Sequence, residues 1–424
     1  MRWFFLFTLL FITACKKKDE LAPEIRISQP LNLTGYNLYN TVHIQGTVTD
    51  DRKLEFVTLQ IVDNTMLPVT VIKSYTPSDK QFTINTGFFL EDIHLESGVY
   101  FIKIKASDGE HEVSEFVEIN ITGVAKTLKE ILVVNAIAGQ YYVNSIDSLD
   151  QLNQEFIIGN EFLDININSY DQLIAISGTT NETYRVIDWI SKSINWEITA
   201  LQNPPFVYFN AMSYNPDKRH FYISTSTGQK YIKNKTGGSV ILSGIYQSMY
   251  QPFEVGFGVD YFLVDEFNAG MSSHHLVKYN YTTGNPIQNI SIPFNMTHLI
   301  QGSIDEFFVF GNQSGVAKMY RYNVSGNSIW EPYTFTEVLK DVVKVSNNIY
   351  YLAMGSGLYQ YTVGNNSLIP VNTAIVIDKM EFDQVNNQIY CLNTSGIQVL
   401  SVAGTIIRSI PVTNAISVGL LYNK

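Results

Sequence analysis

The segment 378–410, DKMEFDQVNNQIYCLNTSGIQVLSVAGTIIRSI, decides the fold class. Apolar and polar residues alternate along it in four short runs. Turn-forming residues separate these runs at 385–387, 393–396 and 403–404. Alternation with a period of two is the pattern of a half-buried strand, and Asn, Gly and Ser between the runs favour tight turns. The segment therefore predicts four antiparallel strands in under 40 residues.

The same pattern recurs through the C-terminal 300 residues. Segment 210–223 repeats a strand, an Asn-containing turn and a Tyr-bearing strand in the same register. Units of this kind begin near residues 164, 208, 252, 297, 339, 374 and 414, at spacings of 35 to 45 residues. A four-stranded unit that recurs at this period predicts a β-propeller.

The two ends of this region complement each other in length. Only 11 residues follow the seventh start, whereas residues 129–159 supply three predicted strands before the first start. Together they make 42 residues, the length of one unit. The final strand is therefore expected to pair with the N-terminal strands of the region. This closes a ring of seven blades over residues 125–424 and leaves no exposed sheet edge at its ends.

The copies at 214–224 and 382–392 resemble the YVTN-type, quinoprotein-like propellers of exported bacterial proteins. The Trp-Asp and Gly-His signatures of WD40 blades are missing. The resemblance implies a fold that serves binding modules and enzymes alike, so it does not select a function.

Residues 23–123 form a separate all-β region. Alternating runs at 42–48, 56–62, 98–105 and 116–121 predict a β-sandwich of some seven strands. Gly46 and Asp50, followed by the pattern Gly98-x-Tyr100 to Ala106-x-Asp108, resemble the Ig-like and cadherin-like modules of bacterial surface proteins. We expect this module to act as a spacer or an accessory binding face.

The cadherin-like resemblance raises the question of calcium. The only plausible ligands are carboxylates at predicted turns: Asp50, Asp51, Asp63 and Asp108. Their spacing does not match a calcium loop, and calcium needs six or more oxygen ligands. Capping of turns by these aspartates is the favoured interpretation, and a calcium site is the alternative.

The N-terminus has the features of a targeting signal. Residues 1–14 contain Arg2 and then a 12-residue run that is almost wholly apolar, which is typical of a signal peptide and too short to span a bilayer. The end of this run, Ile12-Thr13-Ala14-Cys15, resembles the lipobox of bacterial lipoproteins. That resemblance implies cleavage before Cys15, a lipid on its sulfur and a tether over 15–22. The alternative is an ordinary signal with a chance cysteine.

Partners and location follow from the same residues. The resemblance implies membrane attachment through the lipid on Cys15, and two or more acyl chains give stable anchoring. By analogy with Gram-negative lipoproteins, Lys16 implies the outer membrane, on its periplasmic or its surface side. The net charge of −11, from 28 basic and 39 acidic residues, argues against a nucleic-acid partner. Cys391 lies in a predicted strand and is expected to be a buried, inert thiol.

Polar residues near the start of each predicted inner strand are the first candidate site. They are Asp164, Asn210, Glu254, His298, Asp341, Asp378 and Asn414. One interpretation is a polar funnel that holds a cation or a polar ligand. The other, which we favour, is hydrogen bonding between neighbouring blades and channel water.

Aromatic residues between successive blades are the second candidate site. They are Phe206, Tyr208, Tyr250, Phe253 and Phe294. At a rim such rings stack on sugars or grip a peptide. The favoured alternative is that they pack adjacent blades together.

No motif predicts a cofactor, a metal site or a catalytic constellation. His274 and His275 are adjacent in a predicted strand and point to opposite sides, so a zinc site would need partners such as His298. We therefore expect a lipoprotein that binds a protein or a glycan without catalysis. The alternative is a propeller lyase or hydrolase acting on polysaccharide or peptide through channel-mouth acids, which would need titratable groups with perturbed pKa values clustered in a pocket.

Overall fold

The computed structural model describes residues 21–147, 149–180, 182–200, 207–244, 250–268 and 270–424. The chain divides into two compact units, Met1–Ala125 and Lys126–Lys424. Both consist of β-strands, and the regular helix in the described residues is one short 3-10 turn, Val363–Asn365. No helix in these residues has the length and apolarity that a membrane span requires.

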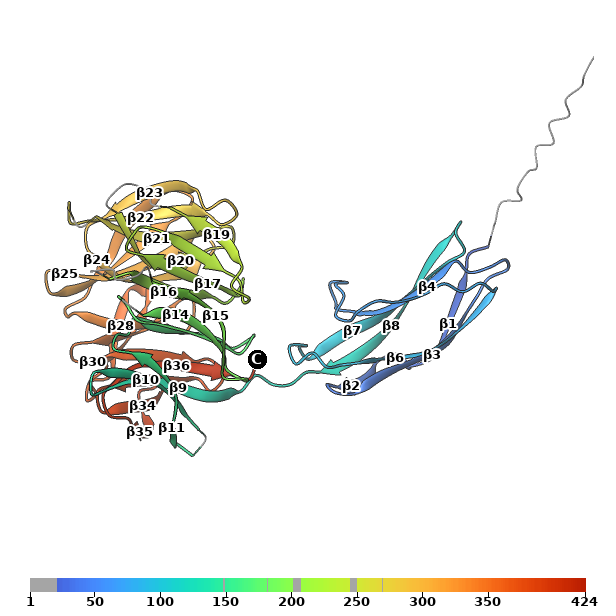
Figure 1. Cartoon of the computed structure of the whole chain (residues 1–424), viewed down its shortest axis with the longest axis horizontal. Helices are drawn as coiled ribbons and strands as arrows, with labels where there is room; N and C mark the ends of the chain where they lie inside the picture. Colours follow the sequence, from blue (N-terminus) through green and yellow to red (C-terminus); the bar gives the residue numbers. More distant parts are fainter. Residues whose placement is uncertain (1–20, 148, 181, 201–206, 245–249, 269) are drawn as a thin grey trace, which may run out of the picture. The chain divides into compact units, whose positions relative to one another are not determined.

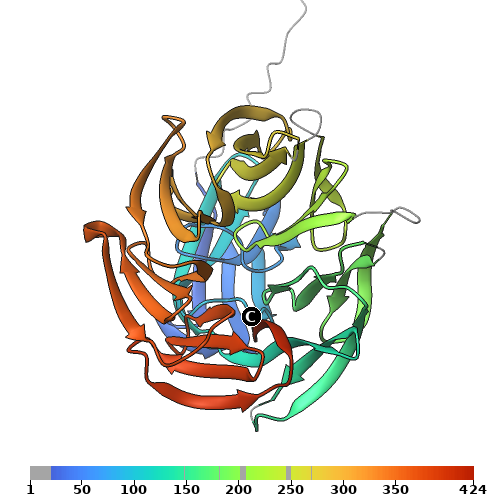
Figure 2. The same cartoon turned by 90° about the vertical axis from the view of Figure 1, so that its left-hand side faces the viewer.

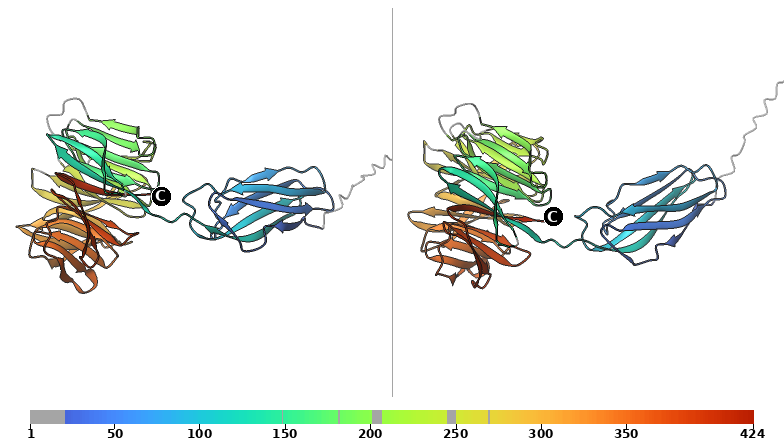
Figure 3. Two further views of the ribbon diagram at one scale, coloured as in Figure 1. Left: turned by 90° about the horizontal axis from the view of Figure 1, so that it is seen from below. Right: turned by 60° about the horizontal axis from the view of Figure 1, so that its bottom comes forward.

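The N-terminal unit contains two sheets (Figure 3). The first pairs β1 (Glu24–Gln29), β3 (Thr41–Thr49) and β6 (Gln81–Phe89) in that order. The second has the order β2 (Thr34–Asn37), β8 (Glu112–Thr122), β7 (Gly98–Ser107), β4 (Phe56–Val62) and β5 (Lys73–Tyr75).

Alternating side chains of both sheets of the N-terminal unit form one apolar core. Val42, Ile44 and Val48 of β3 are fully buried, as are Ile102 and Ile104 of β7. The residues between them in β3 face outward. The period of two in the sequence is therefore the division between core and solvent.

The turn aspartates of the N-terminal unit cap backbone amides. The Oδ1 atom of Asp63 accepts hydrogen bonds from the amides of Thr65 and Leu67, at 2.8 and 2.9 Å. Asp50 accepts one from Arg52 at 2.8 Å, and Asp108 accepts from residues 110 and 111. These bonds are those of turn-capping carboxylates.

The C-terminal unit contains seven four-stranded antiparallel sheets in its described residues. Six of them follow the chain, in pairing order: β12 (Asp164–Asn168), β13 (Leu173–Ser177), β14 (Thr183–Asp188), β15 (Ser193–Thr199); β16 (Phe209–Asn215), β17 (His220–Thr225), β18 (Lys230–Lys233), β19 (Ser239–Ser243); β20 (Tyr250–Phe257), β21 (Tyr261–Asn268), β22 (Ser273–Asn280), β23 (Pro286–Ile292); β24 (Asn295–Ser303), β25 (Glu306–Gln313), β26 (Val316–Asn323), β27 (Ser328–Thr334); β28 (Leu339–Lys344), β29 (Ile349–Met354), β30 (Gly357–Thr362), β31 (Ser367–Asn372); β32 (Lys379–Asp383), β33 (Gln388–Asn393), β34 (Gly396–Ser401), β35 (Ile406–Pro411).

The seventh sheet joins the two ends of this unit. Its order is β36 (Ala415–Tyr422), β9 (Leu128–Ile137), β10 (Gln140–Ile146) and β11 (Leu152–Gly159). Val418 lies opposite Val133, and Leu420 lies opposite Ile131. Figure 1 shows β36 beside β9. The predicted pairing of the C-terminal strand with the N-terminal strands of the region is confirmed.

The first strands of the seven sheets contact one another in a closed order, from β12 through β16, β20, β24, β28 and β32 to β36, which contacts β12 again. Figure 2 shows the sheets around a common centre. Separate apolar clusters fill the spaces between neighbouring sheets. The arrangement is compatible with a β-propeller.

One predicted unit start is wrong. The sequence places the sixth unit near residue 374, whereas β32 begins at Lys379. The first strand of this unit, predicted from residue 378, therefore begins close to its predicted place, and residues 374–377 form a connection before it. Ile375 and Ile377 of this connection are buried in the core between two sheets, 6% and 0% exposed. Their apolar character therefore comes from packing, and the spacings on the two sides of this start become 40 residues, from β28 to β32, and 36 residues, from β32 to β36.

Candidate functional site

The first strands of several sheets carry irregular register near their beginnings. The pairing shifts between Phe209 and Ala211, between Pro252 and Val255, between Met296 and His298, and between Leu339 and Asp341. A β-bulge re-aims the side chains around it. The polar residues predicted near these strand starts lie at or beside the bulges, so their directions do not follow simple alternation.

An imidazole–carboxylate pair joins two of these strands. The Nε2 atom of His298 in β24 lies 2.7 Å from Oδ1 of Asp341 in β28. Asp341 is 5% exposed and also accepts hydrogen bonds from the amides of Val342 and Met380, at 2.9 and 2.5 Å. The carboxylate is thus fully bonded and holds the imidazole in one orientation.

A cavity of about 450 Å³ opens beside this pair. Its wall comes from β12, β24, β28, β32 and β36, and its charged or polar residues are Asp164, Asn166, His298, Asp341, Lys344, Lys379, Glu381, Gln384 and Ser417. Three predicted residues, Asp164, His298 and Asp341, therefore line one cavity.

Surrounding protein changes the ionisation of the acids in and near this cavity. Desolvation raises the pKa of Glu254 to about 7 and the pKa of Glu381 to about 8. Desolvation also raises the pKa of Asp164. The Glu381 side chain is exposed to solvent and that of Glu254 is half-buried, although both are surrounded by protein atoms that desolvate them.

Lys379 balances part of this negative charge. Desolvation lowers its pKa, but the charges of Asp341, Asp164, Glu254 and Glu381 outweigh that effect and raise it. Lys379 and Glu381 are two residues apart in β32 and so share a face of the strand. The cavity thus combines carboxyl groups with the ammonium groups of Lys344 and Lys379.

A pH dependence of stability follows from Glu254. Its pKa in the folded chain lies above the ~4.3 of an unfolded chain. The stabilising contribution is therefore full below about pH 4 and is lost as the pH rises through 7. We expect the free energy of unfolding of the C-terminal unit to fall by about 2 kcal/mol from pH 5 to pH 8.5 through this group.

Urea unfolding followed by tryptophan fluorescence at the two pH values measures this difference. Glu254→Gln should reduce the slope by about this amount, and the rest remains because the pKa of Glu381 is also raised, to about 8. Asp378→Asn, which also neutralises one carboxylate, should keep the full slope. An unchanged slope in Glu254→Gln would contradict the assignment.

The other predicted polar residues lie elsewhere. Asp378 pairs with Lys340 at 2.8 Å and does not line the cavity. Asn210 lies in the β16 bulge, and its Nδ2 atom is buried without a partner among the described residues. Asn414 donates a hydrogen bond from Nδ2 to the carbonyl of Ala136, at 3.2 Å, and so holds the turn before β36.

A second cavity, of about 600 Å³, adjoins the first. The two share Ile165, Asn166, Glu381 and Gln384. The second is lined further on by Tyr170, Tyr214 and Tyr422, near the far ends of the first strands. Together the two cavities form a polar passage along the inner face of the sheets.

The aromatic candidates are mostly packed inside the unit. Tyr208, Tyr250 and Phe294 are 6%, 5% and 4% exposed. Phe294 stacks on Tyr320 with ring centroids 4.7 Å apart, and Phe253 contacts Phe267 at 6.4 Å. Phe206 lies outside the described residues. Burial of these rings favours the interpretation that they pack adjacent sheets.

The adjacent histidines have separate partners. The Nδ1 atom of His274 lies 2.9 Å from both carboxylate oxygens of Asp265, whereas His275 contacts the ring of Tyr250 at 5.3 Å. Among the described residues, no group of three or more His, Cys, Asp or Glu side chains is arranged to hold a metal ion. Cys391 is 1% exposed, and desolvation raises the pKa of its thiol to about 12.

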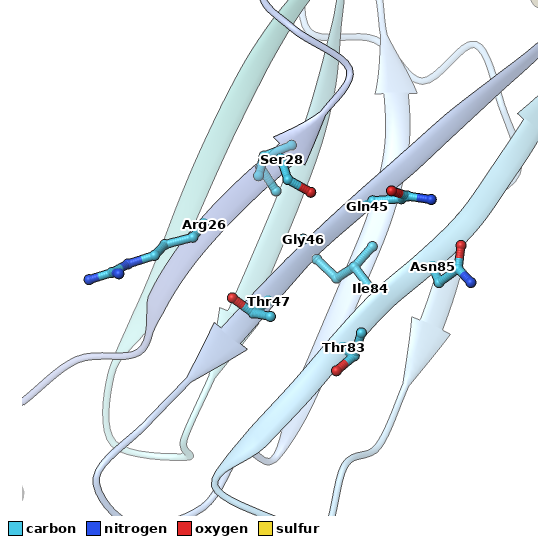
Figure 4. Close-up of a pocket in the computed structure, with 9 residues that line it drawn as sticks. Arg26, Ser28, Gln45, Gly46, Thr47, Thr83, Ile84 and Asn85 are labelled. Atoms are coloured by element: carbon cyan, nitrogen blue, oxygen red, sulfur yellow. The ribbon is translucent and has the colours of Figure 1, made fainter.

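The N-terminal unit has a hollow of its own, of about 450 Å³, on the sheet of β1, β3 and β6 (Figure 4). Ser28, Gln45, Thr47, Thr83 and Asn85 surround it. Arg26 extends away from it in Figure 4 and pairs with Glu24 at 2.7 Å. Arg26 is the one charged residue among those that line this hollow.

Sequence reasoning missed Lys379, Glu381 and Asn166. One polar residue was assigned to each strand start, but residues at i and i+2 of a strand share a face. The pairs Asp164 with Asn166 and Lys379 with Glu381 follow this rule and were visible in the sequence.

Comparisons with known proteins show a similarity of fold and do not indicate a family or a function. No protein-family model and no curated protein matches the sequence. Many solved structures do match. One is a protein from Lactobacillus plantarum, solved as a structural genomics target, with 9% identity and a TM-score of 0.54 over 70% of this chain and 100% of that chain. At this identity the chain is similar to that protein in fold alone, so the function must be argued from the site.

Proposed function

We propose that the chain is a lipid-anchored protein of the Gram-negative outer membrane that binds a polar ligand, protein or glycan, without catalysis. In this proposal the N-terminal unit is an Ig-like spacer and the C-terminal unit is a seven-bladed propeller. The ligand enters the cavity at His298, Asp341 and Lys379.

The polar cavity is the observation that carries the binding role. Carboxylates from three strands, Asp164, Asp341 and Glu381, line it together with Lys379. Pockets that bind small polar groups combine such convergent polar side chains with a rigid frame. Because the strands that supply them are held in four-stranded sheets, the site is preformed.

Screening of the full-length protein on glycan and peptide arrays tests the binding role. We expect hits whose binding is weakened at least tenfold by Asp341→Asn, because that change also releases His298. Asp378→Asn, outside the cavity, should bind like the unmodified protein. Absence of any hit, or hits that Asp341→Asn leaves unchanged, would contradict the role of the cavity.

The anchor is supported by the sequence alone, because residues 1–20 lie outside the described ranges. Replacing Cys15 with Ala removes the only sulfur that a lipid could occupy there. We expect the variant to lose acyl labelling and to leave the membrane fraction, because the lipid on Cys15 is the proposed attachment to the membrane. Retention in the membrane at the wild-type level would contradict the anchor.

A specific observation favours a second candidate function, a lyase or hydrolase. A carboxyl group with a pKa near 7 or 8 is protonated in part at neutral pH and can donate a proton. Glu254 and Glu381 are such groups, and His298 is oriented by Asp341 as a general base would be. Turnover of an array hit, lost in both Glu254→Gln and Asp341→Asn, would favour this function over binding.

A further inference from the structure

Two polar atoms in the wall of the first cavity are buried without a hydrogen-bond partner among the described residues. They are Oδ1 of Asn166 and Nδ1 of His298. Buried polar atoms are normally paired with protein groups or with ordered water, so each of these two can bond a ligand that displaces water from the cavity.

The Asn166 atom is a hydrogen-bond acceptor, and the His298 atom is one in the neutral form of the imidazole. The Nδ2 atom of Asn166 donates to the carbonyl of Ile165 at 3.1 Å, which identifies its other atom as the amide oxygen. The Nε2 atom of His298 faces the carboxylate of Asp341 at 2.7 Å and therefore carries the proton. In the neutral imidazole this leaves Nδ1 as an acceptor.

The nearby carboxylates add further acceptors. Asp164 and Glu381 line the same cavity, and a bound cation would favour their ionised forms, which only accept hydrogen bonds. Lys379 supplies donors and Lys344 is already bonded to the carbonyl of Gln301, at 2.5 Å. The unsatisfied groups of the cavity therefore call for a ligand that donates several hydrogen bonds and carries positive charge.

Ammonium and guanidinium groups have this chemistry. An ammonium group has three N–H donors and a guanidinium group has five, and neither has an acceptor. A metal ion fits less well, because no three ligating side chains in the described residues are close enough to share one. A sugar fits less well too, because its hydroxyls need donors as well as acceptors and carry no positive charge to meet the carboxyl groups of the first cavity.

We infer that the cavity beside His298 and Asp341 receives the basic side chain, lysine or arginine, of a protein ligand. This inference rests on the proposed binding function and names its ligand class. The charged end meets Asn166, His298 and Asp164. The aliphatic stem lies along Ile165 and Ile300 of the same wall.

Calorimetric titration of the full-length protein with capped amino acids tests the inference. The probes are Nα-acetyl-arginine amide and Nα-acetyl-lysine amide. Nα-acetyl-citrulline amide and Nα-acetyl-norleucine amide have similar shapes without the charge. We expect at least one basic probe to bind ten or more times more tightly than its neutral counterpart, and the difference to shrink in high salt.

Matched variants locate the binding. Asp164→Asn keeps the shape of the side chain and should weaken the basic probe about tenfold. Its fold is expected to persist, because the pKa of Asp164 is already raised, and a thermal melt checks this. Asp378→Asn removes the same charge from outside the cavity and should leave binding unchanged.

The outcomes separate the two proposals. Equal binding of arginine and citrulline probes, or binding that Asp378→Asn weakens and Asp164→Asn does not, would overturn the inference. Array hits without basic residues would overturn it too and leave the proposed binding function standing. Binding of glucosamine or spermidine with no binding of either basic amino acid would likewise overturn it. Failure of every array and every probe would instead contradict the proposed function itself.

Discussion

Removal of residues 415–424 should abolish the cooperative unfolding transition of the C-terminal unit. These residues contain β36, whose Val418, Leu420 and Leu421 are 4%, 8% and 0% exposed. The three side chains lie in the apolar clusters on both sides of the sheet. At about 2 kcal/mol each, their loss alone costs about 6 kcal/mol. That is comparable with the whole stability of a typical domain, about 5–15 kcal/mol.

Tryptophan fluorescence during urea unfolding measures this effect. Trp189, Trp196 and Trp330 all lie in the C-terminal unit, and the indole nitrogen of Trp189 donates to Glu130 of β9 at 2.9 Å. The signal therefore reports directly on the sheet that β36 completes. A sigmoidal transition of unchanged midpoint in the truncated chain would contradict the role assigned to β36.

Two controls show that the strand itself, and not its place in the chain, is required. Tyr422 lies opposite Leu128, so a short turn can join them. A chain in which residues 412–424 are moved from the C-terminus to the position directly before residue 128 should therefore fold. In the intact chain, Leu421→Ala should cost about 2–5 kcal/mol, and Ile407→Ala, at a half-exposed position of β35, under about 0.5 kcal/mol.

Lys230→Met should destabilise the C-terminal unit by about 3–5 kcal/mol. The Nζ atom of Lys230 lies 2.9 Å from Oε1 of Glu266 and 2.6 Å from the carbonyl of Gly244. The two side chains are 0% and 1% exposed, and Tyr279 donates a hydrogen bond to the same carboxylate. Without the ammonium group, the carboxylate of Glu266 is left buried without a counter-charge.

The double variant Lys230→Met/Glu266→Leu separates two contributions to the free energy of unfolding: the cost of burying an unpaired carboxylate and the stabilisation by the ion pair. It should recover much of the loss, because replacing both members of a buried ion pair by apolar groups is often neutral. Lys235→Met is the exposed control, since Lys235 pairs with Asp171 at 2.8 Å with its side chain 55% exposed. That change should cost under about 1 kcal/mol. Urea unfolding in which Lys230→Met and Lys235→Met have the same midpoint would refute the prediction.

The strands of this protein could be predicted because their signals are local. The alternation in 378–410 and its Asn and Gly turns identify β32 to β35 without any knowledge of distant residues. The strands β36 and β9 are far apart in the sequence. Their pairing could still be predicted, by counting the strands in each unit and the residues left over at the two ends of the C-terminal region. The start of the sixth unit, predicted near residue 374 and found at Lys379, was less exact, because a buried apolar connection precedes the strand.

The cavity could be predicted only in part. Asp164, His298 and Asp341 were identified by their place near strand starts, but Asp378 stands at an equivalent place and faces Lys340. Bulges in β16, β20, β24 and β28 decide which way such residues point, and a bulge leaves no clear mark on the pattern of apolar residues.

The sequence by itself therefore determined the all-β class, the recurring four-stranded unit and the pairing of the two ends of the C-terminal region, because turn chemistry and period-two alternation act over a few residues. Only the tertiary structure decided that Lys379, Glu381 and Asn166 share a cavity with His298, and that Tyr208, Tyr250 and Phe294 are buried. The physical reason is that the direction of each side chain depends on the bulges and on the packing of neighbouring sheets, which bring together residues more than 200 positions apart.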